Sequence, residues 1–109
     1  MICKHGVKAC ELCVEEPPKS VREAILQTSI SLTMGDRDDT YGDPAETYKR
    51  VAALMNAYKG HPFITAHDVA MLLALMKIGR TATDPNHTDN YVDGAAYMAI
   101  AGEIAERGE

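Results

Sequence analysis

The chain has 109 residues, 46% of them apolar, with 11 basic and 16 acidic side chains and a formal net charge of −5. This length predicts one domain with its own hydrophobic core. The acidic balance argues against general binding to nucleic acid or anionic lipid, because both need clustered Lys and Arg. No apolar run is long enough to span a membrane, and the first residues do not resemble a secretory signal. We therefore expect a cytoplasmic protein.

Residues 1–19 hold a compact set of soft metal ligands. Four residues separate Cys3 and His5 from the CxxC pair Cys10 and Cys13. Thiols stay reduced in the cytoplasm, and four S or N donors at this spacing suit tetrahedral zinc. The sequence predicts a closed structural zinc site, like a small zinc knuckle. Two alternatives stay open: a tail whose thiols bind nothing, and a site in which another chain replaces His5.

Two helices are expected in the first half of the domain. Ser20 with Glu23 three residues later forms a capping-box pattern, and an apolar helical stripe continues to Gly35. The second helix starts at the N-cap Asp43, which a proline follows at the first helical position. It ends at Gly60, which is followed closely by another proline.

Two further helices are expected in the second half. Thr65 is the N-cap of a helix whose body, VAMLLALMKIG, is apolar on all sides. A polar loop over residues 80–90 follows, and the last helix runs from near Asn90 to about Glu106. No convincing strand is present in the sequence.

These elements predict an all-α fold: a small four-helix bundle over residues 20–109. Residues 1–19 form a zinc-knuckle-like appendage, which two consecutive prolines separate from the first helix. One small bundle cannot cover every side of an all-apolar helix. We therefore expect a homo-oligomer.

Charged side chains flank the polar loop. Asp89 and Asp93 are four residues apart on one helical face, and Lys77 and Arg80 end the preceding helix. The acidic and basic pairs are expected to face each other. They form either an internal ion-pair network, or a site in which the carboxylates hold Mg²⁺ and the cations hold phosphate. His87 in the loop is a candidate ligand contact, or else is simply solvated.

The stretch GDRDDTYGDP contains residues that helix capping does not explain. The carboxylates of Asp36 and Asp39 could ligate a metal ion, and the guanidinium of Arg37 could bind a phosphate through two hydrogen bonds. The aromatic ring of Tyr41 could stack on a base. We take Asp36, Arg37 and Tyr41 as candidate ligand-binding residues. In the alternative, Arg37 pairs with a neighbouring aspartate and Tyr41 packs on the bundle.

Three segments occur in a recognisable order: GDRDDTYGDPAETYKRVAAL, ITAHDVAMLLALMKIGR and HTDNYVDGAAYMAI. Together they resemble a phage- and prophage-encoded small domain family of unestablished function, over residues 20–106. The sequence departs from the family pattern at Tyr91, where tryptophan is expected, and at Ala96, where glycine is expected. The resemblance implies a protein located in the cytoplasm of a bacterial host.

More remotely, the last two helices resemble MazG-type nucleotide pyrophosphohydrolases, which are all-α oligomers that cleave nucleoside triphosphates with Mg²⁺. Their EExxE motif is missing here. The resemblance therefore implies a magnesium set made of the catalytic candidates Asp89 and Asp93 with Glu46 or Asp68.

The leading hypothesis is a protein that binds a nucleotide or a nucleotide-derived molecule, with hydrolysis of its phosphoanhydride as a further activity. The alternative is a non-enzymatic phage protein that sequesters a host nucleotide signal or docks on a host protein. In a third alternative the protein is a purely structural interaction module, and every polar pair named above only stabilises the fold.

Overall fold

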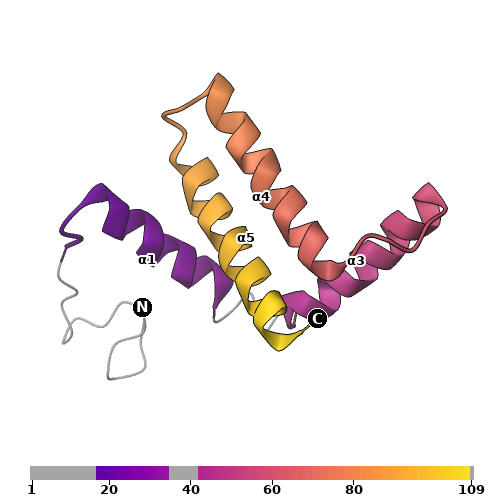
Figure 1. Cartoon of the computed structure of the whole chain (residues 1–109). Helices are drawn as coiled ribbons and strands as arrows, with labels where there is room; N and C mark the ends of the chain where they lie inside the picture. The colour runs from indigo at the N-terminus through magenta and orange to yellow at the C-terminus, as the bar shows by residue number, and fades with distance from the viewer. Residues whose placement is uncertain (1–16, 35–41, 109) are drawn as a thin grey trace.

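The computed structural model describes residues 17–34 and 42–108, and all the regular structure in these ranges is helical. The helices are α1 (Val21–Thr33), α3 (Pro44–Lys59), α4 (Ala66–Thr83) and α5 (Thr88–Arg107), as Figure 1 shows. The predicted all-α class with four helices is confirmed. Seven candidate residues lie outside the described ranges, and their predictions stay untested: Cys3, His5, Cys10, Cys13, Asp36, Arg37 and Tyr41.

The predicted caps fix where the helices begin. The Ser20 hydroxyl accepts the Glu23 N–H at 3.1 Å, but the Glu23 carboxylate accepts the N–H of Lys19 and not that of Ser20. At α4 the capping box is complete, because the Asp68 carboxylate accepts the Thr65 N–H at 3.0 Å and the Thr65 hydroxyl accepts the Asp68 N–H. Each cap satisfies backbone donors that have no partner inside the helix.

The loop between α4 and α5 is shorter than predicted. The sequence pattern indicated residues 80–90, whereas α4 continues to Thr83 and α5 already begins at Thr88. The backbone leaves the helix at Asp84, because the residue before Pro85 is sterically disfavoured in the α conformation. Tyr91 closes this loop by donating its hydroxyl hydrogen to the Pro85 carbonyl at 2.7 Å.

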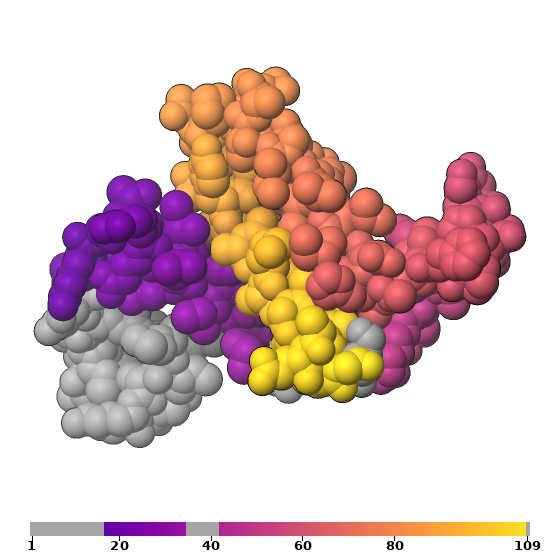
Figure 2. All heavy atoms as spheres, viewed as in Figure 1, coloured from indigo at the N-terminus to yellow at the C-terminus, as the bar shows by residue number. Residues whose placement is uncertain are grey.

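The helices pack as an open row. The antiparallel pair α4 and α5 forms the centre, α1 lies against α5, and α3 lies mainly against α4 (Figure 1). Among the described helices, α1 contacts neither α3 nor α4. Figure 2 shows α1 and the far end of α3 projecting on opposite sides of the central pair. The four helices therefore do not close into a ring around one core.

Small side chains dominate the core and allow the helices to approach closely. The buried apolar residues are Ala45, Ala52, Ala66, Val69, Ala70, Ala74, Val92, Ala96, Ala101 and Ile104. Many larger apolar side chains, including several on α1, α3 and α4, remain exposed. Over the described residues, no helix is both long enough and apolar enough to cross a membrane.

Candidate functional site

A cavity of about 250 Å³ lies where the end of α1, the start of α3 and the middle of α5 meet. Among the described residues, its lining combines aliphatic, aromatic and hydroxyl side chains with one carboxylate, that of Asp93. The residues are Leu32, Thr33, Gly42, Pro44, Thr47, Tyr48, Asp93, Ala96, Tyr97 and Ile100. An apolar hollow with a few convergent polar groups is the usual form of a small-molecule site.

The polar groups of the cavity come from three different helices. Thr33 of α1 lines the cavity, and its hydroxyl hydrogen is shared between the carbonyls of Ser29 and Ile30 of its own helix. Asp93 contributes a carboxylate from α5, and Thr47 a hydroxyl from α3. A hydroxyl can both donate and accept, whereas the ionised Asp93 carboxylate only accepts, so a ligand that carries N–H donors matches Asp93.

Asp93 is also part of an interhelical ion pair. Its Oδ2 lies 2.9 Å from the Lys77 Nζ of α4, and the two side chains are 30% and 13% exposed, respectively. The predicted approach of the basic and acidic pairs is confirmed for these two residues. Gly94 of α5 lies beside Lys77 at this contact, and a Cβ added at position 94 would lie 3.7 Å from the Lys77 Cβ, an ordinary van der Waals distance.

The other members of the two pairs are not brought together. The Asp89 side chain is 79% exposed at the start of α5, and its Oδ2 lies 3.8 Å from the His87 Nε2. Arg80 is exposed and forms no ion pair with either aspartate in the described ranges. Both residues stand near the loop end of the α4–α5 pair, where side chains point into water, whereas Lys77 and Asp93 lie further along the contact.

The two remaining magnesium candidates have local roles. The Asp68 carboxylate caps α4, and the Glu46 carboxylate lies 3.3 Å from the Lys49 Nζ on the same helix. Within residues 17–34 and 42–108, no three His, Cys, Asp or Glu side chains are grouped as a metal site would require. A magnesium site at Asp89 and Asp93 therefore stays a prediction that needs ligands from elsewhere.

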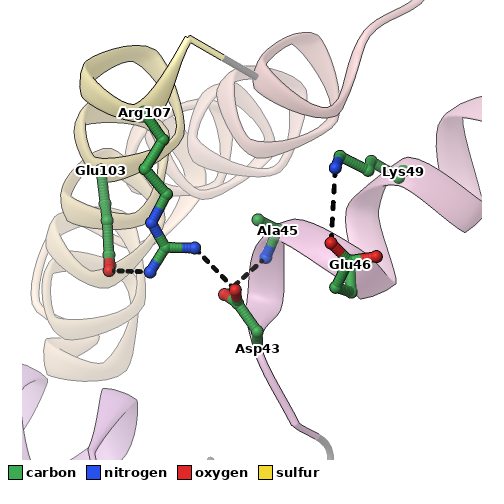
Figure 3. A network of polar contacts seen from close by, with 6 residues as sticks. All are labelled: Asp43, Ala45, Glu46, Lys49, Glu103 and Arg107. Atoms are coloured by element: carbon green, nitrogen blue, oxygen red, sulfur yellow. Dashed lines mark hydrogen bonds and ion pairs between the residues drawn. The ribbon is translucent and has the colours of Figure 1, made fainter.

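The sequence analysis missed a second polar network, drawn in Figure 3. Arg107 at the end of α5 bonds to Glu103 and, at 2.6 Å, to the Asp43 carboxylate that caps α3. The hydrogen bond from Arg107, and then that from the Ala45 N–H, hold the pKa of Asp43 below its ordinary value. The contact between Glu103 and Arg107 could be predicted from the sequence, because residues four apart lie on the same face of a helix. Asp43 is 64 residues away from Arg107 along the chain, and no local signal could reveal it.

A further hollow of about 540 Å³ adjoins the cavity and contains this network. It shares Thr33, Gly42, Pro44 and Ile100 with the cavity and extends to Glu103 and Arg107. Because Asp43 and Glu103 both bond to Arg107, two carboxylates surround one guanidinium in this hollow. The charged side chains of the described residues in this hollow are therefore net acidic, and they do not favour a polyphosphate.

Comparison with known proteins identifies relatives of this chain. The family model described as "Domain of unknown function (DUF6378)" matches residues 24–105. A "Gene 55 protein" of Mycobacterium phage L5 is 38% identical over 77 residues, covering 71% of this chain and 49% of that protein. A "Gene 55 protein" of Mycobacterium phage D29 is 37% identical over 84 residues, covering 77% of this chain and 55% of that protein. The chain spans about half the length of these curated relatives, and no solved structure matches it.

Proposed function

Because the chain belongs to the DUF6378 family, which has phage relatives and no known function, we propose its function from the geometry of the site. The domain is a binding protein that takes the base of a nucleotide-derived ligand into the cavity between α1, α3 and α5. The observation that carries this proposal is the meeting of two tyrosines and the ion-paired Asp93 carboxylate in one largely apolar hollow.

A heterocyclic base suits this lining. The rings of Tyr48 and Tyr97 provide flat surfaces for stacking, and Leu32 and Ile100 complete an apolar wall. A carboxylate accepts hydrogen bonds at both oxygens and donates none when ionised. Lys77 contacts the Oδ2 atom of Asp93, and the other carboxylate oxygen, Oδ1, is the atom proposed to accept a hydrogen bond from the ligand. A base edge with N–H donors is therefore favoured over an edge that offers acceptors.

The surrounding charges support binding of a ligand with few phosphates. Of the cations in the described ranges, Lys77 pairs with Asp93, and Arg107 pairs with Asp43 and Glu103. A triphosphate would have to compete with these carboxylates. The separation of Asp89, Glu46 and Asp68 supports binding without hydrolysis, as in sequestration of a nucleotide signal.

The test measures binding of nucleobases, nucleosides, nucleoside monophosphates and triphosphates by titration calorimetry and by the shift in melting temperature. We expect Asp93→Asn to weaken binding roughly tenfold or more, because it replaces a charged acceptor by a neutral amide. Asp89→Asn is the matched control: the same substitution on the same helix, at a residue outside the cavity. The proposal fails if none of these compounds binds, or if both variants bind as tightly as the unmodified protein.

Hydrolysis is tested separately by following pyrophosphate release from nucleoside triphosphates with Mg²⁺. Under the binding proposal no pyrophosphate appears above the level of a buffer control. Release that Asp93→Asn abolishes would replace the binding function by a MazG-like pyrophosphohydrolase. It would also require the missing magnesium ligands to come from residues outside the described ranges or from another subunit.

A further inference from the structure

Helix α4 has two apolar faces, and only one of them is covered. Ala66, Val69, Ala70 and Ala74 are buried within the chain. On the opposite side lie Leu72, Leu75 and Met76, which are 49%, 56% and 44% exposed, and Gly79. Positions 72, 75, 76 and 79 follow the i, i+3, i+4, i+7 spacing of one helical stripe. We call these four residues the outer stripe of α4.

Charges stand only at the two ends of this face. Asp68 lies one turn before Leu72, and Arg80 directly follows Gly79. A helix face that meets water normally carries polar side chains along its whole length. A contiguous apolar surface with a polar rim is typical of a protein–protein contact.

We propose that the outer stripe is covered by the outer stripe of a second copy of this chain, with the two α4 helices antiparallel about a two-fold axis near Leu75 and Met76. A two-fold contact uses the same patch on both subunits, so the patch must be complementary to itself. This inference rests on the α4 surface alone and does not depend on the proposed ligand.

The antiparallel direction follows from the end charges. It places Asp68 of one helix opposite Thr83 of the other, within one turn of Arg80, so opposite charges lie close together at both ends of the contact. A parallel pairing would place Asp68 beside Asp68 and Arg80 beside Arg80. Like charges so close together disfavour that arrangement.

The sizes of the side chains fit the same register. With the axis between Leu75 and Met76, Leu75 meets Met76 of the partner subunit and Leu72 meets Gly79 of the partner subunit. A Cβ added at Gly79 would have no heavy atom within 4 Å in the single chain, so the space beside this glycine is open. A leucine opposite a glycine fills such a space as a knob fills a hole.

The oligomeric state of the full chain is measured by sedimentation equilibrium over a range of concentrations. We expect a mass of twice 11.9 kDa. Leu75→Lys should raise the dimer dissociation constant roughly tenfold or more, because it places a charge at the centre of the contact. Leu26→Lys is the control, since Leu26 on α1 has a similar exposure of 57% and lies outside the stripe. A monomeric unmodified protein, or dissociation caused by Leu26→Lys instead of Leu75→Lys, would overturn the proposal.

A second pair of variants remains informative even where Leu75→Lys fails to fold. Gly79→Leu and Gly102→Leu both place a leucine at a helical glycine with no heavy atom within 4 Å of the new Cβ. Both raise helix propensity equally, and circular dichroism should show unreduced helicity. Only Gly79→Leu fills the space needed by Leu72 of the partner subunit, and should weaken the dimer. Equal dimerisation of the two variants contradicts the proposed register.

Discussion

The Lys77–Asp93 ion pair links α4 to α5 and touches the cavity, and its contribution to stability can be predicted from its burial. At 2.9 Å and an effective dielectric constant near 20, the two charges attract by about 6 kcal/mol. Removal of both groups from water costs several kcal/mol for each ion, which offsets most of that attraction. The net contribution of the intact pair is therefore small, whereas a broken pair is costly.

The two single substitutions should differ in their cost. Asp93→Leu leaves the Lys77 ammonium, 13% exposed, without a counter-charge, and should lower the free energy of unfolding by about 2–3 kcal/mol. Lys77→Met leaves a carboxylate that is 30% exposed and already hydrated, and should cost about 1–2 kcal/mol. The double variant replaces two charges by two apolar groups and should lie within about 1 kcal/mol of the original protein.

Urea unfolding followed by circular dichroism, at one fixed protein concentration, measures all four members of this double-mutant cycle. Glu46→Gln serves as the control, because Glu46 forms a largely exposed pair with Lys49 whose loss should cost no more than about 0.5 kcal/mol. If the double variant costs as much as the two single variants together, the side chains are not coupled. The geometric reasoning about Lys77 and Asp93 would then be wrong.

Three further predictions follow from other features. The Arg107 hydrogen bond lowers the pKa of Asp43 in the folded chain. The ionised Asp43 carboxylate therefore stabilises the fold fully above the ordinary Asp pKa of about 3.9. This stabilisation is lost as the pH falls through the lower pKa of the folded chain. Asp43→Asn keeps the cap and should flatten this acid dependence in pH-dependent unfolding, whereas Asp43→Ala should also cost about 1 kcal/mol at neutral pH. Gly94→Ala should raise the free energy of unfolding by about 0.5–1 kcal/mol, because alanine has the higher helix propensity and its Cβ would lie at an ordinary 3.7 Å from the Lys77 Cβ. A large decrease in the free energy of unfolding would show that α4 and α5 pack too tightly here for a Cβ. The purified chain should contain one equivalent of zinc, and Cys10→Ser should lose it; a full equivalent retained by Cys10→Ser would contradict the zinc site.

Sequence reasoning succeeded where the signal was local. Helix starts at Ser20, Asp43 and Thr65 were predictable because an N-cap side chain bonds to a backbone N–H two or three residues away. The meeting of Lys77 with Asp93 was also predictable, since a short loop forces α4 and α5 to be antiparallel neighbours.

The contacts that could not be predicted from the sequence join residues far apart in the chain. The Asp43–Arg107 bond joins the start of α3 to the end of α5, and only the packing of the whole chain brings these ends together. The loop length was overestimated because the last turn of α4 and the first turn of α5 are also made of polar residues. The basic pair was predicted to face the acidic pair, but Arg80 and Asp89 lie near the exposed end of the two helices and only Lys77 and Asp93 meet.

The cavity lies where the open row of helices has the fewest contacts. Among the described helices, α1 is held only by α5, whereas the cavity is lined by α1, α3 and α5 together. A ligand in the cavity would therefore add contacts to the helix that has the fewest neighbours, and would join α1 to the start of α3. Ligands stabilise the state that binds them, by an amount set by the ligand concentration relative to the dissociation constant. A rise in the melting temperature with a nucleotide-derived compound therefore reports binding to the native chain, and loss of that rise in Asp93→Asn but not in Asp89→Asn would assign the binding to this cavity.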